Sequence, residues 1–219
     1  RAWAWPDACA RLRARADRSV GMCGAFEEDR IWSQRHTVLL RSDGRAVAFG
    51  ANDDGQCDLP MAEAGVACCF VQVSAGGRHT VLLRNDGRVV AVGCNSAGQC
   101  DIPEAGAGMA YCQVAAGSEH TVLLRSDGRV LSCGSNAYGQ RDLPEPTSKA
   151  GYSQVAAGGR HTVLLRSDGC PVACGANDDG QCNLPTEAEG GSIAAYCQVA
   201  AGARHTVLLR RDGCVVACG

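Results

Sequence analysis

The sequence predicts an all-β fold, a β-propeller or an arc of one, with about five short blades of ~42 residues each. The string His-Thr-Val-Leu-Leu-Arg recurs at steps of 43, 41, 41 and 44 residues. A proline follows each of the first four histidines by 24 residues, and a glutamine precedes each of the last four by 7. A period of this length, with apolar runs too short for helices, is typical of a stack of small β units. The histidines that open the string are His36, His79, His120, His161 and His205.

Residues 1–30 do not fit the repeat, and we expect them to form an irregular N-terminal extension to the repeats of residues 31–219. A short basic helix from Asp7 to Asp17, with Asp7 as its cap, is one expectation for this part. The extension is either the remnant of a degraded unit or a cover for a propeller edge.

Within a unit, the first strand is expected just before the histidine string, as in Tyr111 to Ala115. The run Val38 to Leu40 predicts the second strand, and Ala46 to Gly50 predicts the third. The three-residue turn Ser42-Asp43-Gly44 joins them, with glycine in the left-handed position. Because the runs do not alternate with polar residues, we expect strands buried on both faces. A fourth strand is expected near Asp58-Leu59-Pro60, at an edge because of the proline.

The segment from the proline to the next glutamine is the one variable part of the unit, with steps of 12, 10, 10 and 13 residues. We therefore expect binding specificity in four loops, since the frame itself differs little between units. Acidic residues in these loops favour a basic or mixed-charge partner surface over an acidic one. The loops are Met61–Val71, Glu104–Cys112, Glu145–Ser153 and Thr186–Cys197, with Glu63, Glu104, Glu145, Glu187 and Glu189 against the single lysine Lys149. A competing hypothesis places the binding surface on the opposite rim, at Asp53, Asp54, Asp178 and Asp179.

Composition excludes several classes of protein. A net charge of −2 argues against a strongly basic nucleic-acid binder, and no apolar run approaches the ~20 residues of a membrane helix. The chain has 15 cysteines, an odd number, and no Asn-x-Ser/Thr site. Together these favour a reducing compartment, so we expect a cytoplasmic or nuclear protein.

The stretch Val155-Ala156-Ala157-Gly158-Gly159-Arg160-His161-Thr162-Val163-Leu164-Leu165 resembles the signature of the regulator-of-chromosome-condensation repeat. The stretches Val73 to Leu83, Val114 to Leu124 and Val199 to Leu209 resemble it equally, and so do the Asn-x-x-Gly-Gln motifs that follow. The resemblance covers about residues 31–219. The family usually has longer units and seven blades, so either five units close a small propeller or the chain is an arc of a larger ring. The second alternative is favoured.

The resemblance implies a non-catalytic propeller platform for protein–protein interaction, with no cofactor and no metal. Two alternatives stay open. Some members of the family exchange guanine nucleotides on small GTPases, and many ubiquitin ligases of the HECT type contain this propeller, but no HECT domain occurs here.

Three residue patterns resemble catalytic or metal sites, and each has a simpler interpretation. Five histidines in the same phase are expected to bond neighbouring backbone within their sheets rather than to catalyse a reaction. Ser118, Glu119 and His120 are contiguous, so in extended chain they cannot form a hydrolase triad. The motifs from Asn52 and from Asn177 resemble fragments of calcium loops but lack the closing glutamate.

The cysteines and arginines also recur in phase. In-phase cysteines such as Cys133 and Cys174 are expected to be small buried hydrophobes with free thiols and no metal. The arginine that ends each string is followed two residues later by aspartate, as in Arg41 and Asp43. This favours solvated, charge-balanced hairpin ends over a phosphate-binding ring.

Overall fold

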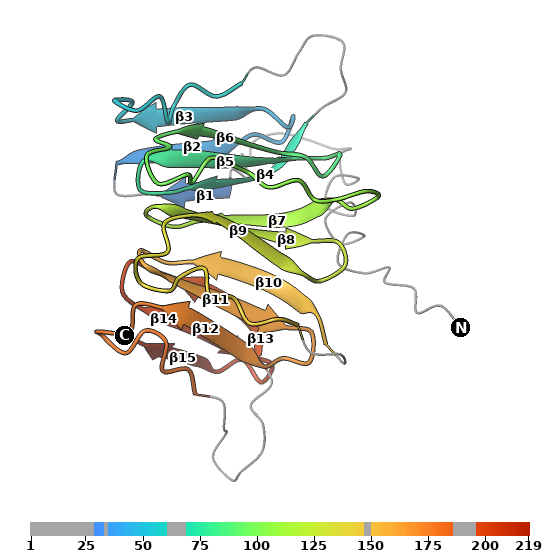
Figure 1. The fold of residues 1–219 in the computed structure, drawn as a ribbon, viewed down its shortest axis with the longest axis vertical. Coiled ribbons are helices and arrows are strands. Elements are labelled where there is room, and N and C mark those ends of the chain that lie inside the picture. Colours follow the sequence, from blue (N-terminus) through green and yellow to red (C-terminus); the bar gives the residue numbers. More distant parts are fainter. Residues whose placement is uncertain (1–28, 33–34, 61–68, 147–149, 186–195) are drawn as a thin grey trace, which may run out of the picture.

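The computed structural model describes residues 29–32, 35–60, 69–146, 150–185 and 196–219. These residues form five three-stranded antiparallel sheets, each built from three consecutive strands, and contain no helix. The sheets stack in sequence order, with the first and last at opposite ends of the stack (Figure 1). The described chain is thus an open propeller arc of five blades, which confirms the predicted fold class.

Every blade has an inner, a middle and an outer strand. The inner strands are β1 (Asp29–Trp32), β4 (Phe70–Ala75), β7 (Tyr111–Ala116), β10 (Tyr152–Ala157) and β13 (Tyr196–Ala201). The middle strands are β2 (His36–Leu40), β5 (His79–Arg84), β8 (His120–Arg125), β11 (His161–Arg166) and β14 (Thr206–Arg210). The outer strands are β3 (Ala46–Gly50), β6 (Val89–Gly93), β9 (Val130–Gly134), β12 (Pro171–Gly175) and β15 (Val215–Cys218). The predicted helix at residues 7–17, and most of the predicted extension, lie outside the described residues.

The turn between middle and outer strands has the predicted form. Gly44 adopts a φ of 79°, and the Arg41 amide donates to the Arg45 carbonyl across 2.8 Å. The Asp43 carboxylate accepts a bond from the Arg45 amide at 3.0 Å, which closes the turn. These turns lie at the same end of the strands in every blade, and we call this side of the arc the hairpin rim. Its turns are Asp43-Gly44, Asp86-Gly87, Asp127-Gly128, Asp168-Gly169 and Asp212-Gly213.

The Asn-x-x-Gly-Gln loops lie at the other end of the strands, where the outer strands end. The predicted fourth strand is absent from the described residues. Segment 58–60 is not a strand. The Asn52 side chain closes the loop that precedes this segment, since it accepts from the Cys57 amide at 2.7 Å and donates to the Asp58 carboxylate at 2.8 Å. The Asp58 amide is also bonded, to the Gly55 carbonyl at 3.1 Å. We call this end, with loops 52–56, 95–99, 136–140 and 177–181, the histidine rim.

The core lies between the sheets. The first five residues of β5, β8 and β11 are buried, as expected for strands covered on both faces. Between the second and third blades, Val81 and Leu83 of β5 pack against Tyr111 and Val114 of β7 and Leu123 of β8. Burial of each large apolar side chain contributes about 1.5–3 kcal/mol, so adjacent blades stabilise one another. The described residues contain no helix long and apolar enough to cross a membrane.

Candidate functional site

Four histidines join each blade to the next. The imidazole Nε2 of each lies within hydrogen-bonding distance of a threonine hydroxyl on the following middle strand. The pairs are His36 with Thr80 at 2.7 Å, His79 with Thr121 at 2.9 Å, His120 with Thr162 at 3.0 Å and His161 with Thr206 at 3.0 Å. The expected backbone partner within the same sheet is therefore wrong, because the ring reaches across the interface to a side chain.

The threonine hydroxyl fixes the tautomer of its histidine partner. Thr121 donates its proton to the Gln99 carbonyl at 2.7 Å, so it accepts a proton from Nε2 of His79. In its neutral form the imidazole therefore carries its proton on Nε2 and leaves Nδ1 unprotonated. Burial, followed by repulsion from neighbouring histidines, lowers the pKa of His79, His120 and His161 to about 4. These side chains are neutral at physiological pH and fastened in place, which suits a structural role.

In the last four strings, a glycine three residues before the histidine makes room for the ring. A Cβ at Gly117 would overlap the imidazole of His120 and lie 2.6 Å from the Gly158 carbonyl of the next blade. The same conflict would arise at Gly76 and Gly158. Only glycine leaves space for both the histidine and the neighbouring backbone, which explains the small-small-Gly lead of the repeat.

Glutamines link the inner strands in the same direction around the arc. The Oε1 of Gln113 accepts from the Val155 amide at 2.9 Å, and the Oε1 of Gln154 accepts from the Val199 amide at 2.8 Å. Gln72 both accepts from and donates to the backbone of Val114. The fixed step of 7 residues marks this glutamine in the sequence, but its partner is visible only in the structure.

A tyrosine fastens the variable connection at the point where it enters the inner strand. The Tyr111 hydroxyl donates to the Pro103 carbonyl at 2.7 Å, and Tyr152 donates to the Pro144 carbonyl at 2.9 Å. Tyr196 makes the same bond to Pro185 at 2.7 Å. The two ends of the connection are thereby held together, so its length can vary without disturbing the blades. The recurrence of an aromatic residue two places before the glutamine was the sequence signal for this contact.

The histidine rim carries matched pairs between adjacent blades. The residue before each histidine faces the third position of the preceding Asn-x-x-Gly-Gln loop. Arg78 lies 3.4 Å from Asp54, Arg204 lies 3.9 Å from Asp179, and the Arg160 guanidinium lies 4.6 Å from the ring centre of Tyr138. Two of the candidate carboxylates, Asp54 and Asp179, therefore have partners within the chain, while Asp53 and Asp178 are exposed.

The third blade has Glu119 where the other pairs have arginine, and the corresponding loop residue of the second blade is Ala97. An arginine there would have no carboxylate or aromatic ring at that loop position to contact. The change at Glu119 thus accompanies a change at Ala97 in the neighbouring blade.

In each turn of the hairpin rim, the arginine that ends the histidine string is paired with the aspartate two residues later, as the sequence pattern predicts. The distance between guanidinium and carboxylate is 3.1 Å for Arg41–Asp43, 2.9 Å for Arg84–Asp86 and 2.7 Å for Arg125–Asp127. Equivalent pairs join Arg166 to Asp168 and Arg210 to Asp212. The first three turns each carry a further exposed arginine, and these are Arg45, Arg88 and Arg129.

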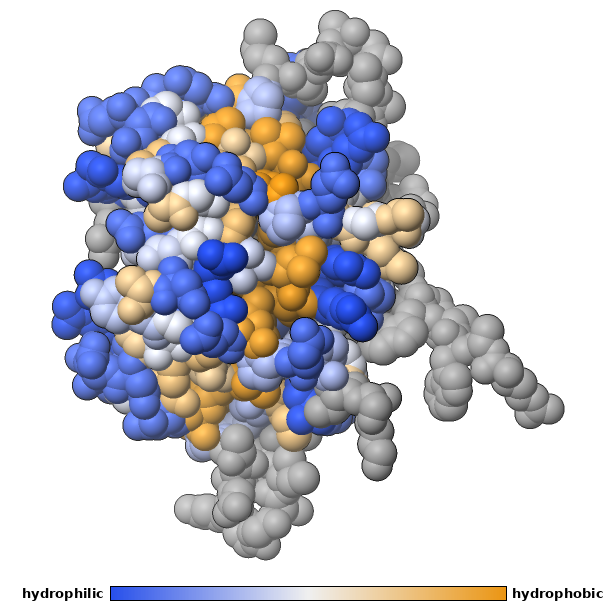
Figure 2. Space-filling model, in the orientation of Figure 1, coloured by the Kyte–Doolittle hydropathy of each residue, from blue (hydrophilic) through white to orange (hydrophobic). Residues whose placement is uncertain are grey.

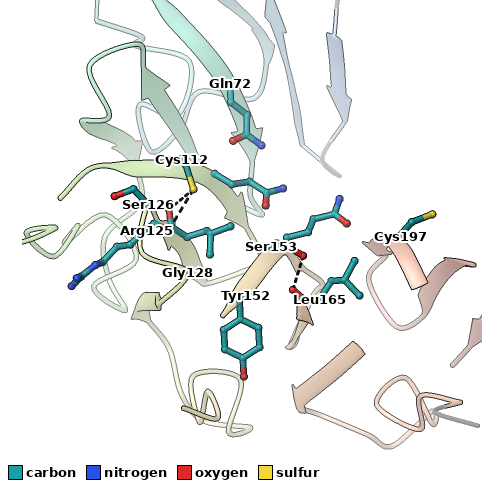
Figure 3. Close-up of a pocket in the computed structure, with 12 residues that line it drawn as sticks. Gln72, Cys112, Arg125, Ser126, Gly128, Tyr152, Ser153, Leu165 and Cys197 are labelled. Carbon is teal, nitrogen blue, oxygen red and sulfur yellow. Dashed lines mark hydrogen bonds between the residues drawn. The ribbon is translucent and has the colours of Figure 1, made fainter. Parts of the chain in front are cut away.

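A cavity of about 380 Å³ lies among the inner strands near this rim. Gln72, Cys112, Ser153 and Cys197 come to it from four successive inner strands, and Ser126 and Gly128 come from one hairpin (Figure 3). Ser153 donates to the Leu165 carbonyl at 3.2 Å, so its hydroxyl is bound within its own blade. The cavity offers side-chain amides, two thiols and apolar surface where the variable connections enter the inner strands.

The predicted acidic residues divide between the two rims. Glu104 and Glu145 are exposed. They follow Pro103 and Pro144, whose carbonyls accept hydrogen bonds from the tyrosine hydroxyls at the start of β7 and β10. They belong to the hairpin rim, whereas the candidate aspartates belong to the histidine rim. Glu63, Glu187, Glu189 and Lys149 lie outside the described residues, as do most of loops 61–71 and 186–197.

The twelve described cysteines are free thiols. Several lie at blade interfaces, where Cys133 donates to the Gln99 carbonyl of the preceding blade at 3.4 Å. Burial raises the pKa of Cys133 to about 11 and of Cys174 to about 12, which keeps both thiols protonated. The described residues contain no group of three or more His, Cys, Asp or Glu side chains able to hold a metal ion.

Comparison with known families places one repeated pattern on the chain four times. The description "Regulator of chromosome condensation (RCC1) repeat" matches residues 70–99, 111–140, 152–181 and 196–219. These stretches make up just over half of the 219 residues. Comparison with curated proteins gives no match.

Solved structures share the fold at low sequence identity. Prp20p from Saccharomyces cerevisiae has 21% identity and a TM-score of 0.70, over 87% of this chain and 56% of its own. Human WBSCR16 has 19% identity and a TM-score of 0.71, over 84% of this chain and 59% of its own. The ectodomain of the Physcomitrella patens receptor kinase CR4 has 18% identity and a TM-score of 0.68, over 91% and 54%. The chain thus spans little more than half the length of each, and the likeness shows a common architecture.

Proposed function

The chain belongs to the regulator of chromosome condensation (RCC1) repeat family, and on that premise we propose that it is a non-catalytic platform that binds a protein partner on its hairpin rim. The proposal rests on one observation: the blade interfaces repeat the same contact, whereas the hairpin rim differs from blade to blade. Every described interface from the first blade to the fifth repeats the same histidine–threonine bond. A frame built from repeated contacts is rigid but does not distinguish one blade from another.

The hairpin rim supplies the differences that recognition needs. Its connections vary in length and residue type between blades, while the tyrosine–proline bonds hold their ends. Exposed Glu104 and Glu145 lie on the same rim as the exposed arginines Arg45, Arg88 and Arg129. Such a surface suits a mixed-charge partner, and the cavity beside Cys112 and Cys197 offers a recess for an apolar side chain.

Two charge-matched double variants test which rim binds. The first, Glu104→Lys with Glu145→Lys, alters the hairpin rim, and the second, Asp53→Lys with Asp178→Lys, alters the histidine rim. Both replace two exposed carboxylates by lysines, so they change the net charge equally. After a partner has been isolated by pull-down, titration calorimetry should show at least tenfold weaker binding for the first variant, about 1.4 kcal/mol. The second should keep its affinity within about twofold.

The reverse pattern would place the binding surface on the histidine rim and refute the proposal. A loop exchange adds a second test with no change at the interfaces: replacing Thr186–Cys197 by Glu104–Cys112 should weaken binding while leaving the circular dichroism spectrum unchanged.

Exchange of guanine nucleotide on a small GTPase is the competing activity. The structure of Prp20p was described together with its binding to Gsp1p and histones, but its identity to this chain is only 21%. Release of a fluorescent nucleotide from purified small GTPases separates the two functions. Catalysed release at substoichiometric amounts of this chain would contradict a non-catalytic platform.

A further inference from the structure

The outer strand of each blade has one edge bonded to the middle strand and an outer edge with no strand paired to it among the described residues. In an antiparallel pair, residues that hydrogen-bond to the partner strand alternate with residues whose backbone groups point away from it. The Arg35–Ala51 and Arg41–Arg45 hydrogen bonds show that the β3 residues opposite Thr37 and Leu39 are the ones bonded to β2. The intervening residues, Ala46, Ala48 and Gly50, therefore direct their amide and carbonyl groups outward. The described residues give these outward groups no hydrogen-bond partner.

Two other blades show how such an edge is blocked. On β9 the guanidinium of Arg141 donates to the outward carbonyls of Gly134 at 2.8 Å and Ser132 at 3.2 Å. On β12 the first outward position is Pro171, which has no amide proton to offer. The equivalent of Arg141 in the first blade is Cys57, and the equivalent of Pro171 is Ala46. Neither device protects β3, and free edges of this kind readily pair with another strand.

The edge of β3 also borders a groove. A cavity of about 650 Å³ is lined by Val47, Phe49, Leu59 and Pro60. Phe49 is 59% exposed, which makes it the most exposed large aromatic side chain among the described residues. Figure 2 shows apolar surface in a column across the stacked sheets, with hydrophilic surface at both rims. A strand laid beside β3 would bury its side chains against this apolar lining.

The hairpin end of the groove is basic. Arg41 and Arg45 line it, and Asp43 neutralises one of the two guanidinium groups at 3.1 Å. The Arg45 side chain is exposed and forms no ion pair with any described residue. An occupant with a carboxylate at this end would supply the missing charge.

We propose that the outer edge of β3 binds an extended segment of a partner protein as a fourth strand of the first blade. The segment runs antiparallel to β3, so its C-terminal end lies beside Arg41 and Arg45. It carries apolar side chains along a stretch of about five residues and one or two acidic residues after them. This surface runs along the outer edge of β3 and meets the hairpin rim at Arg45. It shares with the proposed function that arginine and the premise that the chain binds proteins.

A phage-displayed library of random 12-residue peptides, selected on the full chain, tests this site. The test variant is Ala46→Pro, which removes an outward amide without touching the β2–β3 bonds and has a precedent in Pro171. Its matched control is Val89→Pro, the same position on β6. Selected peptides should share an apolar stretch followed by Asp or Glu, and should bind Ala46→Pro at least tenfold more weakly than wild type. Val89→Pro should bind them as wild type does.

Charge and hydrogen exchange give independent readouts. Arg45→Glu should weaken peptide binding at least fivefold, whereas Arg129→Glu on the third blade should not. Binding should slow exchange of the Ala46, Ala48 and Gly50 amides and leave those of Val89 and Ala91 unchanged. The double variant Glu104→Lys, Glu145→Lys should retain peptide affinity, so that failure of the rim proposal and failure of this one are told apart.

Three results would overturn the proposal. Binding of the selected peptides to Ala46→Pro as tightly as to wild type would put their site elsewhere. Protection of the three amides in the free chain at every concentration would show that the chain itself occupies the edge. Protection that grows with protein concentration would identify a second copy of this chain as the occupant.

Discussion

At the scale of single residues, the blade interface depends on one neutral imidazole held between two sheets. Nε2 of His120 is bonded to Thr162, while its Nδ1 is buried without a hydrogen-bond partner. His205 belongs to the last described blade, and its side chain is exposed. The same residue type in the same phase of the repeat therefore has two different environments, which makes His205 a control for the others.

Replacing His120 by alanine should lower the free energy of unfolding by about 1–3 kcal/mol, because the Thr162 hydroxyl loses its donor and a void remains. Replacing His205 by alanine should change it by less than about 0.5 kcal/mol. Urea denaturation followed by circular dichroism measures both. Equal effects at the two positions would show that the inter-blade bond contributes nothing.

The histidines also predict how stability depends on pH. Their pKa is about 4 in the folded chain and near 6.5 in the unfolded chain, so unfolding takes up protons between these values. Stability should be fully present above about pH 6.5 and fall as the pH is lowered toward 4. For three histidines the slope reaches about 4 kcal/mol per pH unit. Urea denaturation at half-unit intervals tests this, and a constant stability from pH 6.5 to 4.5 would contradict it.

The cysteines should differ in reactivity according to burial. At pH 7.5, iodoacetamide should modify exposed Cys69, Cys197 and Cys214 at least about tenfold faster than Cys133 and Cys174, whose raised pKa values keep them as thiols. Peptide mass spectrometry over a time course gives the rates. Faster modification of Cys133 than of Cys197 would show that the blade interface opens readily.

At the scale of elements, strands and hairpin turns followed directly from the sequence, whereas the inter-blade contacts did not. Val38 to Leu40 and Ser42-Asp43-Gly44 predicted a strand and a turn because both depend on neighbours in the chain. The fourth strand predicted at Asp58-Leu59-Pro60 was wrong, since the Asp58 and Leu59 amides bond to the nearby Gly55 and Cys57 carbonyls. No pattern in the segment itself reveals these bonds. The glutamine spacing was visible, but its partner on the next blade depends on how the sheets stack.

Gln113 offers a test of one element-scale contact. The variant Gln113→Leu leaves the Val155 amide without its acceptor in the interface between β7 and β10, and should cost about 1–3 kcal/mol. Gln198 occupies the same position on β13 and is exposed, so Gln198→Leu should have little effect. Thermal unfolding of both variants against wild type compares them. A similar loss of stability for both would mean that the glutamine acts within its own strand.

At the scale of the whole molecule, stability is shared between neighbouring blades, because each interface joins only two of them. Breaking the middle of the stack should therefore uncouple its halves. We expect His120→Ala to lower the urea m-value as well as the midpoint, as the two parts begin to unfold separately. Hydrogen exchange should show different opening energies for β4–β6 and β13–β15 in this variant and similar ones in the wild type. An unchanged m-value would indicate that the arc still unfolds as one unit.

The repeated histidine–threonine bond has a consequence for how such a chain can change over generations. Since each described interface uses the same donor and acceptor, a blade lost or gained by recombination between gene repeats leaves the remaining contacts chemically intact. Joining the second blade directly to the fourth, for example, would bring His79 against Thr162, a pair equivalent to His79 and Thr121. The matched rim residues would be disturbed, with Arg160 facing Ala97, but an exposed pair contributes only about 0–1 kcal/mol. A change in the number of blades therefore costs little stability, whereas substitution of the histidine, the threonine or the glycine beside them costs much more.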